Sequence, residues 1–252
     1  MKKTPQQLLL GIRLDAGSTA ANFYVSDANA QLYHCLFDSE PREQFVYLWA
    51  GEPAGRTHLL QALCHRLHDT NGGERGARLD PREGAEGRAE EGGAIYIPLK
   101  EREHFTPAIL EGIESLSLVC LDDIDSVAGD GDWERALFST LNRARECQTT
   151  LVVTADSPPA GLPMQLADLR SRLQWGMVFQ VHGPSDEDRK TILQLQAVSR
   201  GFELDDAVSD YILQRSDRSL TVLADVLKRL DTRSLQDKRR VTRPLVKDVM
   251  GW

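Results

Sequence analysis

Five short apolar runs separated by helical patterns constrain the fold of this chain more than any other feature. The runs are nearly continuous rather than alternating, which is typical of strands buried on both faces of a parallel sheet. They span residues 45–49, 94–99, 116–121, 150–155 and 177–181. One helical pattern follows the first run, and another over 133–147 places Trp133, Leu137, Leu141 and Ala144 on one side. This alternation predicts an α/β fold, a three-layer domain with a five-stranded parallel sheet that ends near residue 182.

From Ser185 onward the chain carries helical patterns only. Ser185 is the expected N-cap of the first helix, and Asp188 follows three residues later as an acidic variant of the capping box. Gly201 marks the end of that helix. Further helices are predicted over 205–215, 220–235 and 244–250, the last with a proline start. We therefore expect a base domain over 19–182 and a small all-helical domain over 183–252.

Two stretches lack these patterns. Residues 70–93, TNGGERGARLDPREGAEGRAEEGG, are Gly-rich, highly charged and almost free of large apolar side chains. They cannot bury enough surface to become ordered, so we interpret them as a disordered insertion between the first helix and the second strand. Residues 1–18 are expected to form a flexible N-terminal arm.

The stretch YLWAGEPAGRTHLL, residues 47–60, runs from the first apolar run into a degenerate phosphate-binding loop. The pattern of such loops is G-x-x-x-x-G-K-[ST], in which backbone N–H groups and the lysine hold the phosphates and the hydroxyl binds Mg²⁺. Gly55 and Thr57 match this pattern, but Ala50 replaces the first glycine, Arg56 replaces the lysine, and Pro53 removes one N–H. The same residues also fit an ordinary strand, turn and helix.

A pair of carboxylates ends the third apolar run, in LVCLDDID over 118–125. Next to a phosphate loop, Asp122 is the expected Mg²⁺ carboxylate and Asp123 the acid that polarises the attacking water. Either Thr154 or Asp156, at the end of the following run, is expected to sense the γ-phosphate. The alternative is that the two acids only cap a turn or a helix.

Composition narrows the classes of function. With 30 Lys and Arg against 38 Asp and Glu, the net charge of −8 argues against a protein that mainly coats nucleic acid. The basic stretch 228–243 is interpreted as a solvated helix face. The four cysteines are widely spaced, which indicates neither a zinc site nor a disulfide framework. Reduced cysteines and the lack of a long apolar stretch predict a cytoplasmic protein that does not enter a membrane.

Several motifs together resemble a known group of proteins. These are STAANFYVSDANAQL (18–32), the degenerate loop, SLVCLDDIDSVAGD (117–130), TADSPP (154–159), LADLRSRLQWG (166–176) and GPSDEDRK (183–190). They resemble the AAA+ ATPases of the DnaA branch, and within it the Hda family of DnaA-related regulatory factors. The resemblance covers nearly the whole chain. It implies an AAA+ base domain followed by a helical lid that closes over a nucleotide, which we expect to be ADP or ATP with Mg²⁺.

The resemblance also assigns residues to the nucleotide. Residues 20–25 would approach the adenine, and Thr57 and Asp122 would hold Mg²⁺. The expected nucleotide-binding residues are Phe23, Tyr24, Val25, Gly51, Glu52, Pro53, Ala54, Gly55, Arg56, Thr57, His58 and Asp156.

Arg172 stands where this family has an arginine finger, a guanidinium aimed at the ATP of a neighbouring subunit. A surface salt bridge is the alternative for this side chain. The lid position that normally carries a sensor arginine is Thr221 here. Because Arg56 also replaces the lysine, we expect weak turnover or none at the chain's own site, even with Asp123 in place.

The N-terminal segment QQLLLGI, residues 6–12, resembles the peptide by which bacterial replication proteins bind the sliding clamp. In that interpretation Gln7, Leu8, Leu10 and Ile12 contact the clamp. An N-terminal strand packed on the base domain explains the same residues equally well.

The resemblance implies a negative regulator of replication initiation, which couples the DNA-loaded β sliding clamp of DNA polymerase III to DnaA and stimulates hydrolysis of DnaA-bound ATP. DNA would be contacted mainly through the clamp, and a homo-oligomer is compatible with this function. Asp123 favours an autonomous ATPase motor or helicase loader instead, whereas Arg56 and Thr221 oppose it. A nucleotide-free scaffold is the third alternative.

Overall fold

The computed structural model describes residues 14–15, 17–38, 43–70, 93–217, 219–237 and 239–252. Its strands form one parallel sheet in the order β2-β3-β4-β1-β5. This confirms the predicted five-stranded sheet. Three strands differ slightly from their apolar runs. The strand β2 ends before Leu99, which begins a helical turn, and β3 is shifted by two residues at its start and one at its end, after the turn Ile113–Ser115. The strand β5 ends one residue before its run does. The strands are β1 Phe45–Trp49, β2 Ala94–Pro98, β3 Leu118–Asp122, β4 Thr150–Ala155 and β5 Met177–Gln180.

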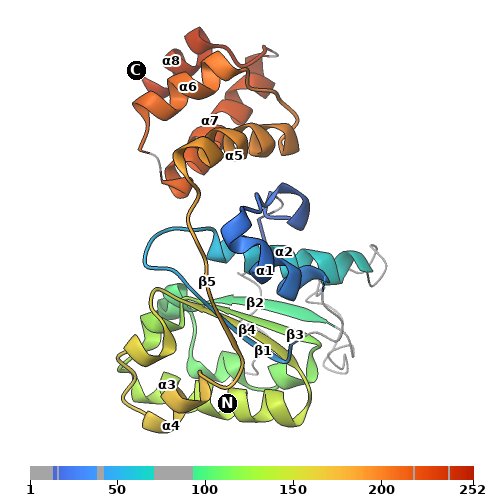
Figure 1. Ribbon diagram of the computed structural model, residues 1–252, viewed down its shortest axis with the longest axis vertical. Helices are drawn as coiled ribbons and strands as arrows, with labels where there is room; N and C mark the ends of the chain where they lie inside the picture. Colours follow the sequence, from blue (N-terminus) through green and yellow to red (C-terminus); the bar gives the residue numbers. More distant parts are fainter. Residues whose placement is uncertain (1–13, 16, 39–42, 71–92, 218, 238) are drawn as a thin grey trace, which may run out of the picture.

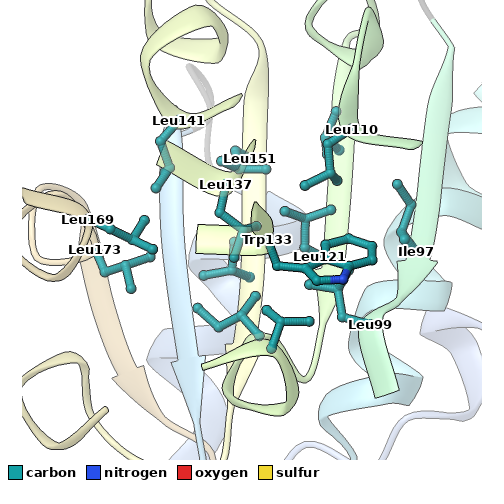
Figure 2. Close-up of a cluster of buried hydrophobic side chains, with 14 of the residues drawn as sticks. Ile97, Leu99, Leu110, Leu121, Trp133, Leu137, Leu141, Leu151, Leu169 and Leu173 are labelled. Atoms are coloured by element: carbon teal, nitrogen blue, oxygen red, sulfur yellow. The ribbon is translucent and has the colours of Figure 1, made fainter. Parts of the chain in front are cut away.

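Helices cover both faces of the sheet (Figure 1). The helices α1 Ala30–Tyr33 and α2 Arg56–Thr70 lie on one face, and α3 Gly131–Glu146 and α4 Ala167–Arg172 lie on the other. Each face has its own apolar core. On the α3 side, Trp133, Leu137 and Leu141 point toward the strand residues Leu121 and Leu151 (Figure 2). The predicted three-layer α/β domain is therefore confirmed.

Short helical turns connect these elements. They are the 3-10 turns Ala20–Asn22, Asp27–Asn29, Leu99–His104, Pro107–Leu110, Ile113–Ser115, Ile124–Val127 and Pro159–Gly161, and a π-type turn His34–Asp38. The insertion expected over 70–93 and the arm expected over 1–18 lie largely outside the described residues.

The C-terminal part is an all-helical lid, as predicted. Its helices are α5 Asp186–Ser199, α6 Asp206–Arg215, α7 Leu220–Asp237 and α8 Arg243–Met250. The predicted capping box is confirmed: the Asp188 N–H donates to Ser185 Oγ, and the Ser185 N–H donates to the Asp188 carboxylate at 2.9 Å. The lid has a separate core that includes Leu193, Leu227 and Val246. It is joined to the sheet by the segment that follows β5 (Figure 1).

The parallel arrangement positions the candidate site. The carboxyl ends of β1, β3 and β4 meet at one edge of the sheet, so the residues that follow these strands come together there. The degenerate loop follows β1, the acids end β3, and Thr154 and Asp156 lie at the end of β4.

Candidate functional site

The loop between β1 and α2 turns at Gly55. The backbone angle φ of Gly55 is +89°, a value that residues with a side chain rarely adopt. A Cβ at this position would lie 3.2 Å from the Phe23 ring, so the glycine also lets the N-terminal segment approach the loop. Of the predicted loop residues, Ala54 is buried, whereas Gly51, Glu52 and Pro53 are exposed.

Arg56 points toward the acids. One guanidinium nitrogen donates to the Ala50 carbonyl at 3.1 Å, and the other lies 3.3 Å from Asp123 Oδ1. Both side chains of this ion pair are largely buried, at 16% and 17% exposure. The residue that replaces the usual lysine therefore forms an ion pair with the second acid.

Asp122 lies at the end of β3 and is only 2% exposed. Its carboxylate accepts three hydroxyl hydrogen bonds, from Thr57 at 2.7 Å, from Tyr96 at 2.8 Å and from Thr154. One carboxylate beside one hydroxyl at the loop fits Mg²⁺, which proteins hold through one or two carboxylates together with substrate phosphates. The arrangement of Thr57 and Asp122 is compatible with Mg²⁺, and their role in holding the ion stays a prediction.

Asp123 is held in an unusual conformation. Its φ of 54° is left-handed, and its N–H donates to Thr154 Oγ1 at 2.8 Å. Burial and the neighbouring Asp122 carboxylate raise the pKa of Asp123, and Arg56 opposes this shift. Thr154 is fully buried and its hydroxyl contacts both acids. Asp156 is exposed at the strand end, and sensing of a γ-phosphate by Thr154 or Asp156 stays a prediction.

A pocket lies beside the loop, between the N-terminal segment, α2 and the lid. The predicted residues Phe23, Tyr24, Ala54, Gly55 and His58 line it, whereas Val25 is exposed and does not. Burial lowers the pKa of His58, whose Nε2 lies 2.9 Å from the Thr19 carbonyl and whose ring meets Phe23 edge to face. The full lining is Asn22, Phe23, Tyr24, Ser26, Asn29, Ala54, Gly55, His58, His182, Pro184, Ile192, Gln196 and Leu220.

The sequence did not indicate the residues that join this pocket to the lid. Asn29 is buried, and its amide pairs with both backbone atoms of His182 at 2.9 Å. The Tyr24 hydroxyl donates to Asp188 at 2.6 Å, which links the pocket to the N-terminus of α5. Asparagine in a turn is common, so no local signal distinguishes Asn29 from a turn residue.

Arg172 ends α4 on the opposite face of the sheet from α2. Its guanidinium stacks on Phe138 and on Trp175. Trp175 directly precedes Gly176, which touches the backbone of Phe45 at the start of β1. The phosphate loop follows the opposite end of the same strand. A strand of five residues spans about 16 Å. Arg172 therefore lies apart from the chain's own phosphate loop.

Gln7, Leu8, Leu10 and Ile12 lie outside the described residues, as does the side chain of Thr221. No helix within the described ranges is both long and apolar enough to span a bilayer.

Comparisons with known proteins agree with this fold. A model of the bacterial DnaA ATPase domain matches residues 18–180, and a model of the Hda lid domain matches residues 186–250. Domain III of the replication initiation protein DnaA from Thermotoga maritima is similar in structure, at 21% identity and a TM-score of 0.73, over 95% of this chain and 98% of that one. AMPPCP-bound DnaA from Aquifex aeolicus matches at 19% identity and a TM-score of 0.62, over 89% of this chain and 71% of that one.

Proposed function

Because the chain belongs to the family of bacterial DnaA ATPase domains and carries an Hda-type lid, we propose that it is a negative regulator of replication initiation. In this proposal it couples the DNA-loaded sliding clamp to DnaA and stimulates hydrolysis of the ATP that DnaA holds. The observation that carries the proposal is the position of Arg172, which lies away from the chain's own loop and is only partly buried. A guanidinium at such a place can serve a nucleotide bound by a second protein.

The chemistry required of Arg172 is electrostatic. Negative charge spreads over the γ-phosphoryl oxygens during transfer, and an arginine supplied from outside the site stabilises that charge. The planar fork of the guanidinium can contact two oxygens at once, which an ammonium cannot do. Arg172 would thus complete the ATPase site of DnaA, and hydrolysis would convert the ATP form of DnaA to the ADP form.

The chain's own site is proposed to bind a nucleotide, chiefly ADP, rather than to turn it over. Arg56 neutralises Asp123, the acid that would polarise water, and this supports weak hydrolysis. Mg²⁺ would be held by Thr57 and Asp122 and would neutralise phosphate charge when bound. The pocket residues Phe23 and His58 would receive the base. Because Tyr24 contacts Asp188, the occupied pocket would fix the position of the lid.

Attachment to the clamp is proposed to depend on Gln7, Leu8, Leu10 and Ile12. The QQLLLGI pattern of residues 6–12 supports this part of the proposal. Binding to the clamp would bring the chain to DNA without a DNA-binding surface of its own, which agrees with the net charge of −8.

The direct test is Arg172→Ala, with the exposed neighbour Arg170→Ala as a matched control. Hydrolysis of DnaA-bound ATP is measured in the presence of clamp loaded on DNA. We expect Arg172→Ala to abolish the stimulation, because such arginines contribute about 10³ to 10⁵ in rate. Nucleotide and clamp binding should be unchanged, Arg172→Lys should restore little, and Arg170→Ala should behave as the parent. Full stimulation by Arg172→Ala would refute the proposal, and rapid hydrolysis by the parent without DnaA would favour a motor.

A further inference from the structure

The surroundings of Arg172 differ from those of the arginines that form ion pairs in this chain. Arg143 contacts Glu114 at 3.2 Å, and Arg233 contacts Asp237 at 3.1 Å. Within the described part of the chain, Arg172 has no carboxylate within ion-pair distance, and its buried Nη1 has no hydrogen-bond partner.

Two aromatic rings take the place of the carboxylate. The Arg172 Cζ atom lies 4.0 Å from the centroid of the Phe138 ring and 4.8 Å from that of Trp175. The faces of aromatic rings carry negative charge, so they attract a guanidinium without accepting its N–H groups as a carboxylate does. The guanidinium is therefore held in place while its hydrogen-bonding capacity stays unspent.

The rings and the helix that carries Arg172 are themselves fixed. Phe138 belongs to α3, whose neighbouring residues Leu137 and Leu141 are buried in the core (Figure 2). Trp175 is about half exposed and stacks on a second guanidinium, that of Arg145, at 4.6 Å. The side chains of Leu169 and Leu173 hold α4 and the turn after it in the same core as α3 (Figure 2).

The start of α4 is held by a buried carboxylate on α3. Glu134 is 1% exposed and accepts the backbone N–H groups of Gln165 at 3.0 Å and Leu166 at 2.7 Å, just before α4 begins. It also accepts the Gly129 N–H at 2.7 Å. Glu134 and Phe138 are one helical turn apart, so α3 fixes both the start of α4 and the guanidinium at its end.

We propose that Phe138 and Trp175 are positioning residues that hold Arg172 stacked and unpaired, ready to meet the phosphoryl group of a nucleotide on a partner protein. The proposal rests on the proposed function of Arg172. A carboxylate in place of either ring would pair with the guanidinium, and that pair would have to break before Arg172 reached phosphate. With aromatic rings instead, Arg172 can keep its contact with the rings or leave them without first breaking an ion pair.

Fluorinated phenylalanines at position 138 change the charge of the ring face and leave the shape of the side chain nearly constant. Phenylalanines with one, three and five fluorines have progressively less negative faces and similar volumes. We expect the maximal rate of DnaA-bound ATP hydrolysis to fall stepwise along this series, and Phe138→Leu to lower it about tenfold, as the loss of one cation–π contact implies. The concentration of regulator that gives half-maximal stimulation should stay nearly constant.

A second measurement needs no partner. Phenylglyoxal modifies accessible guanidinium groups, and peptide mass spectrometry gives the rate for each arginine. In the parent protein we expect Arg172 to react more slowly than the exposed Arg170. In Phe138→Leu and in Trp175→Ala, the rate of Arg172 should approach that of Arg170. The melting temperatures of both variants establish that the fold is retained.

The outcomes are distinct. Equal labelling of Arg172 and Arg170 in the parent would overturn the proposal. An unchanged maximal rate along the fluorinated series would also overturn it, while loss of stimulation by Arg172→Ala would leave the proposed function standing. If fluorination changed only the half-maximal concentration, Phe138 would be a docking residue and not a positioning one. Full stimulation by Arg172→Ala would instead remove the function on which the inference rests.

Discussion

The side-chain contacts of Arg56 support the proposal that the chain's own site has weak turnover or none. A lysine at this position acts as a point charge on the phosphates, whereas the longer, forked guanidinium reaches both Ala50 and Asp123. The loop keeps its glycine turn and its threonine, so the groups that bind phosphate remain. Asp123, the acid that would activate water, forms an ion pair with Arg56.

Asp123→Asn is expected to stabilise the protein. Burial and the Asp122 charge raise the pKa of Asp123, so its ionised form opposes folding despite the Arg56 contact. Asparagine removes that charge and tolerates the left-handed backbone at this position. Thermal unfolding at neutral pH should show a higher midpoint for the variant, and no such gain for the exposed control Asp69→Asn.

The gain from Asp123→Asn should depend on pH in one direction. The ionised form of a carboxyl destabilises the fold when its pKa is higher in the folded chain than in the unfolded chain. The full penalty applies only above the folded-state pKa. The penalty shrinks as pH falls through that value and disappears below the unfolded-state pKa. Unfolding curves of the two proteins should therefore converge in acid. A gain that stays constant or grows with acidification would contradict this account.

Among the elements, α3 has two functions. One side of the helix fills the core with Trp133, Leu137 and Leu141, and another side holds α4 through Glu134. The short helix α4 has six residues and cannot be stable by itself, because isolated helices of this length do not form in water. Its position therefore comes from these contacts.

Glu134→Ala is expected to destabilise the protein strongly. It leaves three partly buried hydrogen bonds without their acceptor, and a buried N–H that loses its partner costs about 1–3 kcal/mol. The free energy of unfolding should fall by about 3 kcal/mol or more. Urea unfolding measures the change, with Glu146→Ala, exposed on the same helix, as a control that should shift it by less than about 0.5 kcal/mol. A similar small shift for both variants would show that Glu134 is not an anchor.

At the scale of the whole molecule, the base and the lid are joined around the pocket. Asn29 holds the backbone of the connecting segment at His182, and Tyr24 reaches Asp188 at the start of α5. A ligand in this pocket would touch residues from both parts. We therefore expect occupancy of the pocket and the position of the lid to be linked.

Removing residues 71–92 is expected to leave the whole molecule stable. Their composition offers few apolar groups to offset the entropy of ordering, and a long loop costs little more to close than a short one. Replacement by a short Gly–Ser link between α2 and β2 should leave the melting temperature nearly unchanged. A large decrease would mean that the segment packs on the core.

The N-terminal peptide is expected to determine attachment to the clamp. Gln7→Ala together with Leu10→Ala removes a hydrogen-bonding amide and an apolar anchor, and such anchors carry most of the energy of a small interface. Surface plasmon resonance should show loss of binding to the sliding clamp, and nucleotide affinity should be unchanged. Retained clamp binding would indicate that the peptide has a structural function instead.

The local patterns of the sequence determined the layers and much of the site. Continuous apolar runs placed the five strands, because a parallel sheet covered on both faces must be apolar throughout. The spacing of Trp133, Leu137 and Leu141 identified the buried side of α3, and Ser185 with Asp188 identified the start of the lid. The positions of Gly55, Thr57 and Asp122 followed from motif spacing, since each lies next to the end of its own strand.

Only the tertiary structure decided which way the site side chains point and what they meet. Arg56 matched the lysine of the motif in sequence, but its direction depends on Asp123, 67 residues away. Arg172 faces two rings from different segments instead of a carboxylate, and Asn29 pairs with His182, 153 residues away. Side-chain direction depends on which distant groups lie within hydrogen-bonding or stacking distance. That neighbourhood exists only after the strands have paired and the helices have packed, so no local pattern in the sequence contains it.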